Sequence, residues 1–107
     1  MKIKILLFAL LTSLFLINCS SSVPTFAVQN NSSQVIDLTL ISQSGATLNV
    51  NAVAIGATSN PIDLNVGDTY TVSVSKINCN KCTSVTSDNG KIYTGVVTDA
   101  GVVVTSK

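Results

Sequence analysis

The chain has 107 residues, of which 46% are hydrophobic and 10% are charged, which is enough for one small domain and too little for two. It contains no Arg, Glu, His or Trp, and its six lysines and five aspartates give a net charge of +1. No cluster of basic residues is present, which argues against nucleic-acid binding. The lack of His removes the commonest general base, which argues against most enzymes that use a nucleophilic side chain.

The first 18 residues have the pattern of an export signal. Lys2 and Lys4 make the start of the chain positive, and an apolar run follows from residue 5 to residue 17. A permanent membrane helix is the weaker alternative, because spanning a bilayer takes about 20 apolar residues. We therefore expect residues 1–18 to be a signal peptide, helical before it is cleaved.

The end of this run, Leu16-Ile17-Asn18-Cys19, resembles the lipobox of bacterial lipoproteins. Leu16 fits the first position and Cys19 the invariant cysteine, while Asn18 stands where Ala, Gly or Ser is more common. The resemblance implies that the thiol of Cys19 is acylated and that the chain is cut before it. Two or more acyl chains would then anchor the protein to a membrane. The alternative is a plain secreted protein in which Cys19 is incidental.

Residues 19–23 would then form the lipidated cysteine and a short tether, and residues 24–107 a single domain. Serines at positions 20–22 suit a flexible link. No Asp follows Cys19; in bacteria with two membranes this favours the outer membrane. Without the signal the side chains carry four lysines against five aspartates, a net charge of −1.

Alternation of apolar and polar residues predicts strands through most of this domain. Val and Thr favour strands, and clusters of Asn, Ser, Asp and Gly predict the turns between them. In the third strand the alternation places Ala52 on the same face as Leu48 and Val50. A polar loop is expected at 78–83 and a tight turn at 88–90. The strands are predicted at 25–28, 36–41, 48–52, 62–66, 69–75, 92–97 and 102–105.

Seven or eight short strands and no helix predict an all-β fold, a small antiparallel β-sandwich. Residues 64–70, Leu-Asn-Val-Gly-Asp-Thr-Tyr, resemble the tyrosine corner of immunoglobulin-like and fibronectin type III sandwiches. Leu64 and Tyr70 match this motif in type and spacing, and Gly67 supplies the turn. The resemblance implies that the Tyr70 hydroxyl bonds to upstream backbone at a crossover between two sheets. The alternative is an ordinary hairpin with Tyr70 in the core.

Cys79 and Cys82 are the two cysteines that remain once Cys19 is lipidated, in an oxidising compartment. We expect a disulfide that makes the loop rigid. A thioredoxin-like redox role would need the first thiol at the start of a helix in a βαβ setting. Zinc would need four ligands, more than this pair offers without a second molecule. Both are weaker alternatives.

No other motif predicts chemistry. The possible bases Lys76, Lys81 and Lys91 lie in no catalytic motif, and most of the aspartates lie beside turn residues. Residues 88–90 lack the further oxygen ligands of a calcium loop. The stripe of hydroxyl side chains at 69, 71, 73 and 75 is expected to be an exposed sheet face, or a contact surface.

These observations predict a non-enzymatic cell-envelope lipoprotein that presents a β-sandwich for binding, an adhesin-like module with no cofactor and no metal. Its ligand would be a protein or a glycan, held by loops at one end. The alternative is a structural accessory subunit of a periplasmic or outer-membrane assembly, whose uncharged strands a partner covers. A small enzyme or redox protein is the least favoured class.

Overall fold

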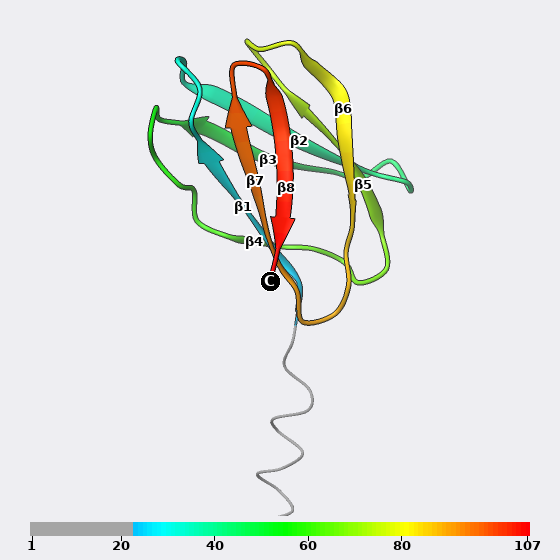
Figure 1. Cartoon of the computed structure of the whole chain (residues 1–107). Helices are drawn as coiled ribbons and strands as arrows, with labels where there is room; N and C mark the ends of the chain where they lie inside the picture. Colours follow the sequence, from blue (N-terminus) through cyan, green and yellow to red (C-terminus); the bar gives the residue numbers. More distant parts are fainter. Residues whose placement is uncertain (1–22) are drawn as a thin grey trace, which may run out of the picture.

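The computed structural model describes residues 23–107, which form eight strands in two layers with no helix among them (Figure 1). The predicted signal peptide and Cys19 lie outside these residues. Each strand is between two and eight residues long. The strands are β1 (Thr25–Asn30), β2 (Ile36–Ser42), β3 (Thr47–Val53), β4 (Ile62–Asp63), β5 (Thr69–Val74), β6 (Cys79–Thr86), β7 (Ile92–Thr98) and β8 (Gly101–Ser106).

The strands form two four-stranded sheets, in the orders β4-β1-β7-β8 and β3-β2-β5-β6. The predicted all-β sandwich is confirmed. All neighbouring strands pair antiparallel except β1 and β7, which run parallel over the whole length of β1. Three hairpins, β2–β3, β5–β6 and β7–β8, each stay within one sheet.

The core lies between the two sheets and follows from the alternation in the sequence. Side chains at every second position of β1, β2 and β5 turn inward and are buried. Phe26 packs against Gly95 of the neighbouring strand β7 so closely that a β-carbon at position 95 would lie 2.7 Å from Cζ of the phenylalanine ring. Glycine at position 95 is therefore required by the packing of the aromatic ring.

The even-numbered face predicted for β3 is wrong at its end. Ala52 is exposed and Val53 is buried, because a bulge shifts the register against β2. The backbone of Ala52 has a φ of 55°, and its N–H donates to the Asp37 carboxylate over 2.7 Å. The sequence placed Ala52 inward because alternation takes no account of an inserted residue.

The strand predicted at 62–66 is shorter than expected, and β4 contains only Ile62 and Asp63. Leu64 is buried, but Val66 is 59% exposed. The chain leaves the sheet after Asp63 and crosses to the other layer, which turns Val66 outward despite the alternating pattern.

The polar loop predicted at 78–83 is also wrong, because strand β6 begins at Cys79. Three residues, 80–82, lie opposite the single residue Ser73 of β5, so the strand bulges and then resumes pairing. Residues 80–82 do not alternate between the two faces of the sheet because the bulge interrupts their pairing. The sequence pattern therefore did not predict a strand here.

The chain crosses between the sheets four times, twice at each end of the sandwich. The β1–β2 and β3–β4 connections cross at the end farther from the start of the domain (the far end; top of Figure 1). The β4–β5 and β6–β7 connections cross at the end where β1 begins, which we call the near end. The predicted turn at 88–90 is confirmed by a bond from the Lys91 N–H to the Asp88 carbonyl, and it belongs to the last of these crossovers.

Candidate functional site

The described domain is joined to the N-terminal segment at its near end. Pro24 is fully buried, and its carbonyl accepts the Leu64 N–H over 2.9 Å. Strand β1 follows at once, at Thr25. Pro24 is thus part of the folded domain, five residues after Cys19. Leu16, Ile17, Asn18 and Cys19 themselves lie outside the described residues.

The residues predicted as a tyrosine corner meet at the β4–β5 crossover. Tyr70 is 1% exposed, and its hydroxyl oxygen accepts the main-chain N–H of Asn65 over 2.9 Å. Leu64 is buried beside it in the same core. Gly67 has a φ of 86°, a left-handed conformation that glycine adopts at little cost. Tyr70 thus ties a strand of one sheet to the segment arriving from the other.

Tyr93 holds the second near-end crossover in the same way, and sequence reasoning missed it. Its hydroxyl donates to the Thr86 carbonyl and accepts the Asp88 N–H, both over 2.9 Å. The upstream N–H that each tyrosine accepts lies five residues before it. A glycine in the left-handed conformation lies three residues before each tyrosine, Gly67 and Gly90, and this spacing was the available signal. It was missed because Ser87 stands where the first motif has Leu64.

Ser87 joins the two near-end crossovers. It is fully buried, and its hydroxyl donates to the Asn65 carbonyl. Its main chain accepts from Gly67 over 2.7 Å and donates to the Asp68 carbonyl over 2.9 Å. The near end is thus one hydrogen-bonded unit built from both crossovers.

Asn30 joins the two crossovers at the far end. Its fully buried amide donates to the carbonyls of Gln34 and Val53, both over 2.8 Å. Its side-chain oxygen accepts the N–H and the hydroxyl of Ser32, over 2.9 and 2.6 Å. The Asn30 carbonyl also accepts the Gly56 N–H. The sequence indicated only a turn residue here, because nothing local reveals partners more than 20 positions away.

The disulfide predicted between Cys79 and Cys82 is present, and it closes the bulge of β6 near the far end. Cys79 is 2% exposed, whereas Cys82 lies on the surface. Lys81 has a φ of 56° inside this loop, and its N–H donates to the Ser73 hydroxyl over 2.9 Å. The disulfide therefore closes the loop on itself, and the hydrogen bond to Ser73 fixes it to β5.

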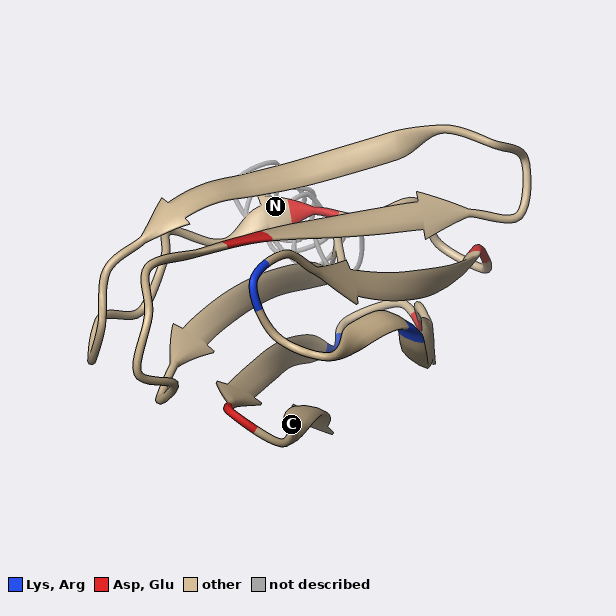
Figure 2. Cartoon of the chain, turned by 90° about the horizontal axis from the view of Figure 1, so that it is seen from above, with Lys and Arg blue, Asp and Glu red and all other residues tan. Residues whose placement is uncertain are grey.

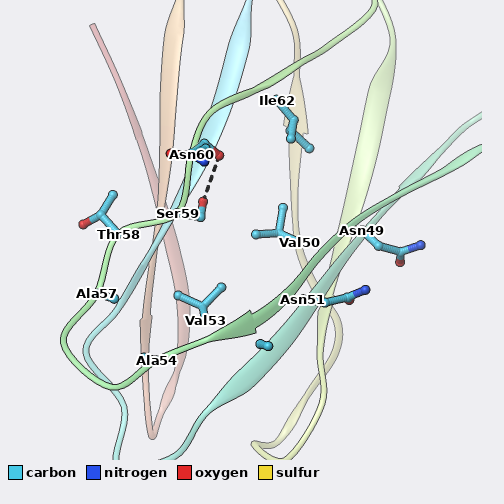
Figure 3. Close-up of a pocket in the computed structure, with 11 residues that line it drawn as sticks. Asn49, Val50, Asn51, Val53, Ala54, Ala57, Thr58, Ser59, Asn60 and Ile62 are labelled. Atoms are coloured by element: carbon cyan, nitrogen blue, oxygen red, sulfur yellow. Dashed lines mark hydrogen bonds between the residues drawn. The ribbon is translucent and has the colours of Figure 1, made fainter.

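A groove of about 460 Å³ opens along the other side of the molecule, between strand β3 and residues 57–62 (Figure 3). Val50, Val53 and Ile62 lie around this space, while Asn49 and Asn51 point away from it. Residues 57–59 are held against β1 by a bond from the Ser59 N–H to the Val28 carbonyl. The groove is thus lined by apolar side chains between the edges of the two sheets, with polar residues around it.

Charged residues are few and spread over the domain (Figure 2). Within residues 23–107 no group of three or more His, Cys, Asp or Glu could hold a metal ion, and no helix is long and apolar enough to cross a membrane. The hydroxyl side chains of β5 were expected to be exposed. Thr69, Thr71 and Ser73 are half-buried instead, because β5 lies between β2 and β6 in the sheet. The features that distinguish this domain are the joined crossovers at its two ends, the disulfide of β6 and the groove beside β3.

Comparison of the chain with protein-family models, with curated proteins and with solved structures finds no match.

Proposed function

We propose that this protein is a lipid-anchored lipoprotein of the bacterial cell envelope that presents its β-sandwich as a non-enzymatic binding module. The observation that carries the proposal is the short path from Cys19 to the buried Pro24. Five residues at no more than about 3.5 Å each reach roughly 17 Å, so an anchored Cys19 would keep the near end beside the membrane.

The far end would then face away from the membrane, and it is the place we propose for ligand contact. Its loops are held by Asn30 and by a bond from the Ser33 N–H to the Asp99 carboxylate over 2.9 Å. The Cys79–Cys82 disulfide fixes a third loop nearby. Rigid loops lose little conformational freedom on binding, which favours affinity. A protein or a glycan is the proposed ligand class.

The immunoglobulin-like resemblance enters as part of this proposal. The resemblance rests on the crossover that Tyr70 holds, and not on the order of the strands. Immunoglobulin-like sandwiches serve as binding modules in many settings.

A second candidate is an accessory subunit of an envelope assembly, on the outer membrane or in the periplasm. The observation that favours it is the uncharged groove beside β3, which a partner would cover. We propose the outer membrane as the location in either case.

Antibody access on intact cells tests the lead proposal. An epitope inserted after Ala100, in the β7–β8 turn at the far end, should bind antibody on intact cells if the module is displayed at the surface. An epitope appended after Lys107, at the near end, is the matched control, and it should react less than the far-end epitope before lysis and equally after it. If neither epitope reacts before lysis and both react afterwards, the surface module is refuted and the accessory subunit is favoured.

A further inference from the structure

The β6–β7 connection at the near end contains an asparagine followed by a glycine. Asn89 and Gly90 are the two central residues of its turn, which a bond from the Lys91 N–H to the Asp88 carbonyl closes over 3.2 Å. Both are exposed, in the lowest loop of the domain in Figure 1. We propose that Asn89 is a site of spontaneous deamidation, at which the side-chain amide becomes a carboxylate. The site does not depend on the lipid anchor or on a binding role of the domain.

The reaction needs only these two residues and water. The main-chain nitrogen of Gly90 loses its proton and attacks Cγ of Asn89, which closes a five-membered succinimide ring. The bond from Cγ to Nδ2 breaks, and the side-chain nitrogen leaves with the proton as ammonia. Water then opens the ring. Attack at Cγ gives aspartate, and attack at the main-chain carbonyl gives isoaspartate, in which the main chain runs through the former side chain.

The glycine at position 90 favours this attack. A side chain on the attacking residue would hinder the approach of its nitrogen to the preceding side chain, and glycine has none. The turn holds Gly90 at a φ of 80°, a conformation that glycine adopts at little cost. No main-chain carbonyl within residues 23–107 accepts the Gly90 N–H. The nitrogen therefore gives up no main-chain hydrogen bond of the domain when it reacts.

Several other asparagines precede an N–H that is already bonded. Asn31 is also exposed in a loop, but the N–H that follows it donates to the Asn30 side chain over 2.9 Å. The N–H that follows Asn51 donates to the Asp37 carboxylate over 2.7 Å. Attack by these nitrogens would first cost a hydrogen bond. The same holds for the N–H groups that follow Asn30, Asn78 and Asn80.

The remaining asparagines of residues 23–107 are protected by the residue type that follows. Asn49 and Asn65 precede valine, whose branched side chain shields the main-chain nitrogen. Asn60 precedes proline, which has no N–H to lose. Among the described residues, Asn89 therefore has the most reactive combination of exposure, neighbour and hydrogen bonding.

The products would change the near end, because the turn joins two fixed points. Before it, the Tyr93 hydroxyl accepts the Asp88 N–H over 2.9 Å. After it, the Lys91 carbonyl accepts the Thr25 N–H over 3.2 Å. Isoaspartate lengthens the main chain between these points by one atom, and either product places a second carboxylate beside Asp88. We therefore expect the β6–β7 crossover to loosen as Asn89 is converted.

Peptide mapping by mass spectrometry tests this proposal on the full chain, purified in detergent and incubated in mildly alkaline buffer. A free peptide of residues 86–94 is the reference. Conversion of Asn89 in the folded protein should lie within tenfold of the peptide rate and give both aspartate and isoaspartate. Asn31 in the same sample should convert at least tenfold more slowly than Asn89. Slower conversion of Asn89 than this, or conversion of Asn31 within tenfold of it, would overturn the proposal.

Glutamine variants provide the matched control. Asn89→Gln keeps the amide but moves it one carbon away, so that attack would have to close a six-membered ring, and conversion at this turn should stop. Asn31→Gln should leave the conversion of Asn89 unchanged. After incubation, amide exchange at Asp88 should be at least threefold faster in the wild type and unchanged in Asn89→Gln. Unchanged exchange in fully converted wild type would overturn the expected loosening of the crossover.

Discussion

The near and far ends of this sandwich both hold two crossovers together, but they use different chemistry. At the near end Tyr70 and Tyr93 each accept a main-chain N–H, and Ser87 joins the two segments. At the far end a single amide, that of Asn30, bonds to both crossovers, and a disulfide fixes the loop beside them. At the near end three buried side chains thus hold the crossovers, whereas at the far end one buried amide joins the two crossovers to each other.

This difference suits the proposed roles of the two ends. Several separate hydrogen bonds at the near end would keep it folded if the proposed membrane tether strained any one of them. A far end organised around one residue leaves most of its loop side chains free to contact a ligand. The following predictions test how unequal the two ends are.

Asn30→Ala is expected to have the largest effect. It removes four side-chain hydrogen bonds and leaves main-chain groups of Ser32 and Val53 without partners, so the free energy of unfolding should fall by about 3 kcal/mol. Urea unfolding followed by circular dichroism measures it. Asn31→Ala, one position along and exposed, is the control and should change stability by less than about 0.5 kcal/mol. A loss below about 1 kcal/mol at Asn30 would show that other contacts hold the far end.

Replacing both Cys79 and Cys82 by Ser should cost about 2 kcal/mol, as the chain-entropy model gives for a loop of four residues. Reducing the wild-type protein should have the same effect. Amide exchange should become faster around residues 75–83 and stay unchanged at Asn65 and Asp88. Faster exchange at the near end would mean that the two ends are not independent.

The two tyrosines allow the same chemical change to be compared at two places. Tyr93→Phe removes two hydrogen bonds and should lower the free energy of unfolding by about 2 kcal/mol. Tyr70→Phe removes one and should lower it by about 1 kcal/mol. Thermal and urea unfolding of both variants measure the difference. The reverse order would show that the β4–β5 crossover is the more important of the two.

Ala52→Gly is expected to have the smallest effect, and in the opposite direction. Alanine in a left-handed conformation costs about 1–2 kcal/mol, and glycine avoids this cost. The greater flexibility of glycine in the unfolded chain costs about 0.5–1 kcal/mol. The free energy of unfolding should therefore rise by about 0.5 kcal/mol. Ala54→Gly, two residues along and without a positive φ, is the control and should lose stability. Equal changes at both positions would refute a strained bulge.

Much of the fold was predictable because β1, β2 and β5 alternate cleanly and their inward residues belong to one core. The errors fall where alternation is interrupted. At Ala52 and at 80–82 extra residues bulge a strand, and at Leu64–Val66 the chain crosses between sheets while still alternating. The sequence pattern reports which residues are apolar, not which ones are paired.

The candidate site was predictable only in part, for a similar reason. Cys79 and Cys82 are close in sequence, and Tyr70 lies within a seven-residue motif, so both could be identified locally. Asn30 bonds to Val53, which is 23 positions away, and the groove beside β3 lies at a sheet edge that only the strand order defines. Such features depend on topology, and no single segment of the sequence contains them.

Mass spectrometry of the N-terminal peptide, from protein isolated with the membrane fraction, tests the central proposal most directly. The account predicts that the mature chain begins at Cys19 and that this residue carries a thioether-linked diacylglycerol, with or without a further acyl group on its amine. A chain that retains residues 1–18, or one whose Cys19 is unmodified, would contradict the lipid anchor and with it the proposed orientation of the two ends.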